Sequence, residues 1–383
     1  MESLIPLDYA TLRVVWWALL GVLLIAFAVM DGFDLGIAAL LPVVARTDVE
    51  RRVVINVVGP VWEGNQVWLI TAGGAIFAAW PLLYAASFSG FYLAMMLALI
   101  ALIIRPVGFK YRSKMEGTRW RNTWDGLLCA SGVLAALVFG VAMGNLIVGV
   151  PFGFDANTLR PEYYGHFYQL FSPFALLAGV VSVLMLIMHG AVVLAWRTEG
   201  AVAMRARRAG QITALLTAVL FVVGGFVVAG MDGHVIESGV NFMAASDPAL
   251  KTVAVQTGGW LANFEKWPLA WAAPALGVGG ALLVAMLIGT RAYWLTFILS
   301  SAAVSGIILT VGLALFPFLM PSSTAPRFGL TVWDASSSPL TLWIMLLGVV
   351  FFLPIITAYT AWVYRVMRGK VTAETVSGTP NSY

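Results

Sequence analysis

The sequence is poor in charge, in cysteine and in histidine, and each shortage narrows the class of protein. Only 10% of its 383 residues are charged, well below the roughly 25% of an ordinary soluble domain. A single cysteine, Cys129, excludes a disulfide framework and the paired-cysteine motifs of structural metal sites and c-type haem. The three histidines are scattered along the chain. We therefore expect neither a metal site nor haem ligands in this chain.

Apolar residues take the place of the missing charge, at 61% of the sequence. They gather in long runs, each long enough to cross a bilayer core of about 30 Å. We predict an all-α polytopic membrane protein, one transmembrane domain over residues 1–383. Its nine membrane-spanning helices are expected near residues 14–41, 53–79, 82–104, 123–144, 172–196, 209–230, 268–288, 294–319 and 339–364.

The basic residues give these helices an orientation. Of the 22 Lys and Arg, 17 fall in alternate connecting segments and in the C-terminal tail. Because positively charged loops stay in the cytoplasm, we expect a periplasmic N-terminus and a cytoplasmic C-terminus. This use accounts for the basic composition, so we expect no nucleic-acid partner. The longer segments on the opposite side, about 145–171 and 231–267, are predicted to form a structured periplasmic cap.

Two further patterns concern packing and membrane anchoring. Tryptophan and tyrosine cluster near the predicted helix ends, Trp362 and Tyr364 among them, as is typical of side chains at the membrane interface. The sequence GVAMG at residues 140–144 has small residues four apart, a spacing that lets two helices approach closely.

Two aspartates interrupt the first apolar run, in the sequence FAVMDGFDLG at residues 27–36. Asp31 and Asp34 are the only charges between Val14 and Leu41, and their spacing of three places them on one helix face. Ionisable groups at membrane depth usually face a bundle interior or a hydrated cavity and mark proton or ion routes. The pair is therefore a candidate functional site.

A second polar cluster lies in the next predicted helix, in the sequence PVWEGNQVW at residues 60–68. Glu63, Asn65 and Gln66 form a polar stripe, and Pro60 leaves a backbone carbonyl free nearby. The connection between the two helices is short, so we expect Glu63 to converge with Asp31 and Asp34 at similar depth. Burial and mutual repulsion would suit such carboxyl groups to exchange protons.

Other interpretations of these acids remain open at this point. The carboxylates could hold helices together by pairing with Arg105 or Lys110 at the inner end of the third helix. They could bind Na⁺ or another cation. An ion-coupled secondary transporter, which also places carboxylates at mid-membrane, is the alternative class of protein.

The chain resembles subunit II of the cytochrome bd quinol oxidases. The likeness covers nearly the whole sequence and rests on long blocks in the family's order: FAVMDGFDLG, GNQVWLITAGGAIFAAWP (64–81), SGFY (89–92), RPVGFKYRSK (105–114), SPFALLAGVVSV (172–183), FPFLMPSST (316–324), WDASSS (333–338) and YTAW (359–362).

The resemblance implies a non-haem subunit with two four-helix bundles and a ninth peripheral helix, in the bacterial inner membrane. Its partner, subunit I, would carry the b- and d-type haems, oxidise quinol and reduce O₂ to water. The acids at Asp31, Asp34 and Glu63 match positions proposed to feed protons to the partner. The resemblance also implies lipid contacts and allows for a structural quinone in this subunit and for small single-helix accessory subunits.

Two positions depart from the family pattern. Lys110 stands in RPVGFKYR where the family commonly has an aspartate, which removes a carboxylate at the cytoplasmic mouth. In VWEGNQ, Val61 replaces a common histidine and Glu63 a common aspartate. Lys110 could block the familiar proton entry electrostatically, or entry could shift to subunit I.

Overall fold

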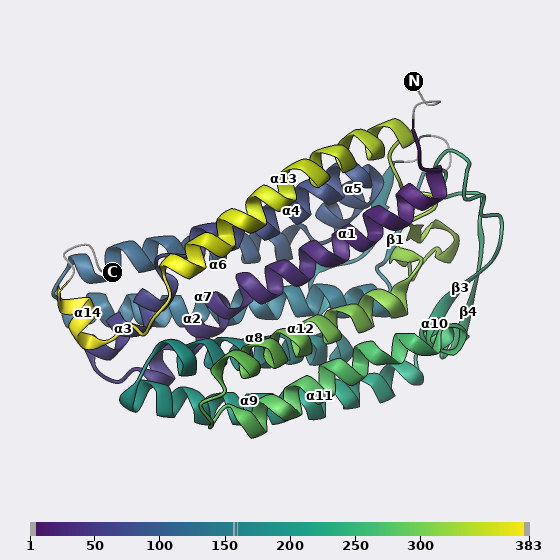
Figure 1. The fold of residues 1–383 in the computed structure, drawn as a ribbon. Coiled ribbons are helices and arrows are strands. Elements are labelled where there is room, and N and C mark those ends of the chain that lie inside the picture. The colour runs from purple at the N-terminus through teal and green to yellow at the C-terminus, as the bar shows by residue number, and fades with distance from the viewer. Residues whose placement is uncertain (1–4, 156–157, 159, 379–383) are drawn as a thin grey trace.

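The fold is a bundle of long helices that share one approximate direction (Figure 1). The computed structural model describes residues 5–155, 158 and 160–378. The long helices are α1 (Tyr9–Met30), α2 (Gly32–Val44), α4 (Trp62–Ala79), α6 (Tyr92–Tyr111), α7 (Thr118–Val148), α8 (Pro173–Arg197), α9 (Gly200–Ala229), α11 (Ala272–Leu287), α12 (Tyr293–Leu315) and α13 (Pro339–Val366). Shorter helices are α3 (Asp48–Val58), α5 (Pro81–Gly90), α10 (Ala262–Lys266) and α14 (Ala373–Gly378).

Eight helices in the described part of the chain are long and apolar enough to cross a membrane, with α1 and α2 together as one. The predicted helix at 53–79 is instead two helices, α3 and α4, interrupted between Gly59 and Val61. Pro60, which has no amide hydrogen to donate, lies in that interruption. The predicted helix at 82–104 is likewise divided into α5 and α6. The count of nine spans therefore stays a prediction.

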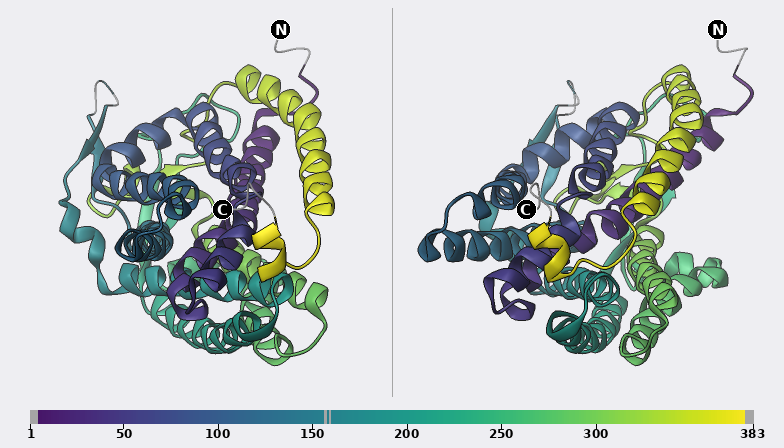
Figure 2. Two further views of the ribbon diagram at one scale, coloured as in Figure 1. Left: turned by 90° about the vertical axis from the view of Figure 1, so that its left-hand side faces the viewer. Right: turned by 60° about the vertical axis from the view of Figure 1, so that its left-hand side comes forward.

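The two ends of the bundle differ in character. The "basic end" carries the α2–α3, α6–α7, α8–α9 and α11–α12 connections and the described end of the chain (Figure 1). The "cap end" carries the described residues of 149–155, 158, 160–172, 230–268 and 316–338, and there the described chain begins. The left panel of Figure 2 views the bundle from the basic end.

The cap end is built from three short antiparallel hairpins: β1 (Phe152–Phe154) with β2 (Pro161–Tyr163), β3 (Asp232–Ser238) with β4 (Thr252–Thr257), and β5 (Phe318–Met320) with β6 (Leu330–Thr331). A buried ion pair of 2.7 Å between Lys251 and Asp334 connects two of the cap segments. Arg13 of α1 donates to the carbonyls of Phe242 and Ala244. The two segments predicted to form a structured cap therefore do carry strands, and residues 316–338 join them.

Helix α2 lies in the centre, packed against both α7 and α8, and glycines make this close approach possible. A Cβ at Gly36 would overlap the carbonyl oxygen of Leu186 on α8. A Cβ at Gly190 would lie 2.7 Å from the backbone nitrogen of Ile37. Both contacts lie below normal van der Waals separations, so the helix backbones touch without side chains between them. The position of the DGFDLG segment is thereby fixed by backbone packing.

The GVAMG segment has the packing role expected of it, between α7 and α8. A Cβ at Gly140 would lie 2.5 Å from the Ser182 side chain, and one at Gly144 would lie 2.7 Å from Ala175.

The last long helix, α13, is the least embedded. It runs across the outside of α1 and α4 (Figure 1, yellow), and Leu342 is the one residue of this helix that is buried. Its outward side chains are large and apolar, as expected of a helix that faces lipid or another subunit.

Candidate functional site

Asp31 lies where α1 gives way to α2, and it is paired with an arginine from a distant part of the chain. Arg105, on α6, places Nη2 2.8 Å from Oδ1 of Asp31, and both side chains are fully buried. Removing one partner of a buried ion pair leaves an uncompensated charge, which costs about 3–5 kcal/mol. The expected pairing of an acid with Arg105 is therefore present, for Asp31.

Asp34, on α2, is also fully buried and has a different partner. Nδ2 of Asn65, on α4, donates to Oδ2 of Asp34 at 2.9 Å. Oδ1 of the same amide accepts from the hydroxyl of Tyr364, on α13, at 2.8 Å. A line of polar contacts therefore leads from Asp34 to the half-buried Tyr364 near the basic end.

The electrostatics of the two acids are unequal. One guanidinium is paired with one carboxylate, so a negative charge on Asp34 would be stabilised by the charge of Arg105, with which it forms no ion pair, and by the hydrogen bond from Asn65. Within the described chain, Oδ2 of Asp31 and Oδ1 of Asp34 have no hydrogen-bond partner, and neither have Nε and Nη1 of Arg105. Because buried charged groups without hydrogen-bond partners are energetically costly, binding a water molecule or a proton at this site would be favourable. It combines two carboxyl groups, one cation and unused hydrogen-bonding capacity inside the bundle.

Glu63 does not share this environment. It lies in the first turn of α4 with its side chain exposed on the surface of the chain, and no hydrogen bond or ion pair joins it to Asp31 or Asp34. The reason is helical geometry, because residues two apart point to nearly opposite faces. Asn65 faces inward, so Glu63 faces outward, and the expected single stripe of Glu63, Asn65 and Gln66 is wrong. A functional part for Glu63 stays a prediction.

The remaining predicted residues lie at the margin. Gln66 is half-buried, one residue along α4 from Asn65. Lys110 is exposed in the last turn of α6, and no ion pair connects it with the buried acids. Of the two cations offered as partners for the carboxylates, Arg105 therefore takes that role and Lys110 does not.

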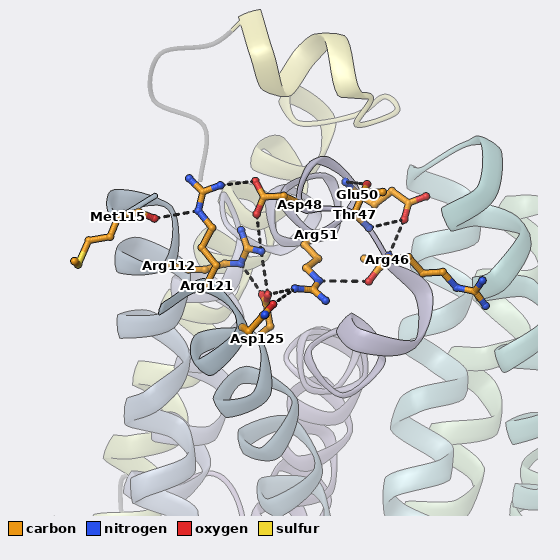
Figure 3. Close-up of polar contacts among 11 residues, drawn as sticks. Arg46, Thr47, Asp48, Glu50, Arg51, Arg112, Met115, Arg121 and Asp125 are labelled. Carbon is orange, nitrogen blue, oxygen red and sulfur yellow. Dashed lines mark hydrogen bonds and ion pairs between the residues drawn. The ribbon is translucent and has the colours of Figure 1, made fainter. Parts of the chain in front are cut away.

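At the basic end, charged residues form a network that joins α3 with η2 (Arg112–Lys114) and α7 (Figure 3). Arg112 contacts Asp125 through Nε at 2.5 Å and Nη2 at 3.0 Å, and its Nη2 lies 2.9 Å from Asp48. Arg51 reaches Asp125 at 2.7 Å, and Arg121 reaches Asp48 at 2.8 Å. This network holds the α2–α3 connection and so helps to position the acid-bearing helix.

A second ion pair secures the same connection from the other side. Arg205, on α9, contacts both carboxylate oxygens of Glu50 at 3.0 Å. The hydrogen bond from Arg205 lowers the pKa of Glu50 to about 2, with help from the backbone amides of Arg46 and Thr47. Glu50 also completes the capping box at the start of α3 with Thr47. Neither network was evident in the sequence, since the partners lie up to 155 residues apart.

Both ring nitrogens of His189, the buried histidine on α8, have hydrogen-bond partners. Its Nε2 lies 2.9 Å from the carbonyl oxygen of Val29, and its Nδ1 lies 2.9 Å from the hydroxyl of Ser300. Among the described residues, no three His, Cys, Asp or Glu side chains are grouped as a metal ion would require. The imidazole instead connects three helices near Asp31.

A large apolar cavity of about 550 Å³ lies among α1, α7, α8, α9, α11 and α12. Its lining includes Phe139, Met143, Phe174, Leu177, Phe221 and Trp271. Ser182 and Thr310 supply the hydroxyl groups of the described lining, and that of Thr310 already donates to the Gly306 carbonyl. A cavity of this size and character suits an apolar chain better than a charged molecule.

A buried acid pair inside long apolar helices defines a multi-pass membrane protein with an intramembrane ionisable site. The chain belongs to the family described as "Cytochrome bd terminal oxidase subunit II", which it matches over residues 12–367. Its expected family, and its expected multi-pass location in the bacterial cytoplasmic membrane, are thereby confirmed.

Individual relatives agree with this assignment. The chain is 52% identical over 378 residues to the cytochrome bd-I ubiquinol oxidase subunit 2 of Escherichia coli K12, covering 98% of this chain and 99% of that one. It is 48% identical over 376 residues to a probable cytochrome oxidase subunit 2 of Haemophilus influenzae, with coverage of 98% and 99%. In fold it is similar to a chain of the bd oxidase structure from Geobacillus thermodenitrificans, with a TM-score of 0.68 at 17% identity, over 93% and 98% of the two chains.

Proposed function

We propose that this chain is the haem-free subunit II of a terminal oxidase that oxidises quinol and reduces O₂ to water. In this proposal the haems belong to subunit I, and the present chain stabilises that partner and supplies protons to it. The observation that carries the proton role is the pair of fully buried acids, Asp31 and Asp34, of which only Asp31 is paired with an arginine. With both acids ionised, the two carboxylates and the guanidinium carry a net charge of −1. Binding one proton makes this buried site neutral.

The proposed route begins at the basic end, which we assign to the cytoplasm. The excess of Lys and Arg there supports this assignment, and the two ends of the described chain lie at opposite ends of the bundle (Figure 1). This placement agrees with an odd number of crossings, and we propose nine, in two four-helix bundles with α13 outside them. The division of the second span at Pro60 gives α4 its polar first turn.

Glu63 has a separate part in the proposal. Its exposed side chain on α4, beside the weakly packed α13, supports a face that subunit I covers. A carboxyl group at such a face can pass a proton between subunits once the partner removes it from lipid. Asp31 and Asp34 would then hold protons within this chain, and Glu63 would deliver them.

We further propose that the apolar cavity holds a quinone as a structural component. Its volume of about 550 Å³ supports an isoprenoid tail, and its few hydroxyl groups argue against a redox-active ring that must exchange protons. Phe139, Met143 and Phe221 would contact the tail. Bound there, the molecule would fill space between helices.

The test of the proton role uses the assembled oxidase with matched haem content. Asp31→Asn, Asp34→Asn and Glu63→Gln are compared with Glu116→Gln, an exposed acid near the basic end. Turnover in the three variants should fall at least tenfold, while the control keeps wild-type turnover. Full turnover in all three would remove the proton role and leave a scaffold whose acids only join helices. An ion-coupled transporter would instead purify without a haem-bearing partner.

A further inference from the structure

Asn65 bridges two groups that can each donate or accept a proton. Its Nδ2 donates to Asp34 and its Oδ1 accepts from Tyr364, at 2.9 and 2.8 Å. The second contact joins residues 299 positions apart and attaches the cytoplasmic end of α13, a helix that otherwise packs loosely. A side-chain amide has a donor end and an acceptor end, so its orientation depends on the state of both neighbours.

The charge of Asp34 selects one orientation of the amide. An ionised carboxylate only accepts hydrogen bonds, so Nδ2 must face it and Oδ1 must face the phenol, which then donates. A carboxyl group protonated on Oδ2 can donate, so rotating the amide by half a turn places Oδ1 toward Asp34. Nδ2 then faces the phenol oxygen, and the Tyr364 hydrogen is free to turn elsewhere. The proton that Asp34 binds forms the O–H bond on Oδ2, and no other covalent bond changes in this exchange.

We propose that Asn65 and Tyr364 are positioning residues that couple the protonation of Asp34 to the direction of the Tyr364 hydroxyl group. While Asp34 is ionised, the Tyr364 hydroxyl group donates to the Asn65 amide. Protonation of Asp34 frees the hydroxyl hydrogen to turn toward the basic end. The direction of a hydroxyl group on the outermost helix, α13, thereby depends on whether the buried Asp34 is protonated. This inference rests on the proposed proton role of Asp34.

Other charged groups act on the same pair without replacing the amide. Asp31 and Arg105 both influence the charge on Asp34, and Arg197, on α8, acts on the Tyr364 hydroxyl. Arg197 itself donates to the backbone carbonyl of Met367 at 2.5 Å. The charges of Asp31, Arg105 and Arg197 therefore also affect which orientation of the Asn65 amide is favoured.

On other helices that pack against α2, several ionisable groups have partners of their own. On α8, both ring nitrogens of His189 bond to Val29 and Ser300. Asp125 of α7 and Arg205 of α9 are held in ion pairs at the basic end. Among the residues that the structure describes, Asn65 is the one whose side chain donates a hydrogen bond to Asp34.

The experiment is a pH titration of the assembled oxidase by infrared difference spectroscopy. The carboxyl band of Asp34 is identified by its loss in Asp34→Asn. Asn65→Ala removes both bonds, and Tyr364→Phe removes only the phenol. Tyr359→Phe, at an exposed tyrosine of the same helix, is the control.

In Asn65→Ala, Asp34 should bind its proton about tenfold more tightly, the effect of losing one hydrogen bond to a charged group. Tyr364→Phe should give a smaller change of the same sign. In the wild type, the tyrosine C–O band should change as Asp34 titrates, and Asn65→Ala should abolish that change. Tyr359→Phe should behave as the wild type.

The results separate this inference from the function it depends on. A titrating Asp34 band that Asn65→Ala and Tyr364→Phe leave unmoved overturns the coupling and spares the proton role. The absence of an Asp34 band in the wild type overturns both.

Discussion

Nη2 of Arg105 and Oδ1 of Asp31 lie 2.8 Å apart in the interior, although 74 residues separate them in the chain. Both side chains are fully buried, and one guanidinium serves a site that holds two acids. The pair therefore has two consequences. It holds α6 against the junction of α1 and α2, and it leaves Asp34 as the acid without a cation of its own.

The first prediction concerns this pair. Arg105→Ala should strongly reduce the yield of assembled oxidase, because Asp31 is left as an unpaired buried charge, at a cost of about 3–5 kcal/mol. The double variant Asp31→Asn, Arg105→Gln should recover much of the yield, since both charges are then gone. Yield is measured as haem absorbance per amount of membrane. A normal yield from Arg105→Ala would contradict the prediction.

The second prediction concerns acid stability at the basic end. The hydrogen bond from Arg205 holds the pKa of Glu50 at about 2 in the folded chain, below its ordinary value near 4.5. A carboxyl group with a lowered pKa contributes stability that is full above about pH 5 and is lost as pH falls toward about 2. Glu50→Gln should lower the melting temperature at neutral pH and flatten its fall on acidification. Glu199→Gln, in a looser and more exposed pair with Lys370, is the control and should change little. Equal acid sensitivity of Glu50→Gln and the wild type would oppose this.

The third prediction concerns the close packing of α2. Gly36→Ala would press a methyl group into the Leu186 carbonyl of α8, so the helices must separate, at a cost of about 1–3 kcal/mol or more. At Gly21 of α1, by contrast, an added Cβ meets nothing within 4 Å. Gly21→Ala should therefore be neutral or stabilising by up to about 1 kcal/mol. Melting temperatures of the purified complex distinguish the two, and tolerance of Gly36→Ala would refute the packing argument.

The fourth prediction concerns the apolar cavity. Ala142→Phe, in its lining on α7, should displace the proposed quinone, and lipid extraction should then recover much less quinone per complex. Val219→Phe, on α9 outside the lining, is exposed and should keep the wild-type amount. An unchanged quinone content in Ala142→Phe would place the molecule elsewhere.

Much of the site was accessible from the sequence because charge in an apolar run is conspicuous. Asp31 and Asp34 were selected on that ground, Asn65 as part of a polar stripe and Arg105 as a possible partner for the acids. The structure joins these four residues in two pairs. Tyr364 was interpreted as a membrane-interface anchor. Nothing local distinguishes an anchoring tyrosine from one that donates to a side chain 299 residues away.

Two other features depend on long-range packing and could not be predicted from local patterns. The ion pairs of Asp125 and Glu50 join segments that only the fold brings together. The glycines at 36 and 190 matter because their helices cross there. The outward direction of Glu63, in contrast, was accessible, because its spacing of two from Asn65 already excludes a shared face.

The most direct measurement is proton uptake during a single turnover. The fully reduced oxidase is mixed with O₂, and a pH indicator reports the protons taken from solution, in the wild type and in Asp34→Asn with equal haem content. Our account predicts that uptake in Asp34→Asn is at least tenfold slower while O₂ binds at the wild-type rate. Uptake as fast as in the wild type would contradict it.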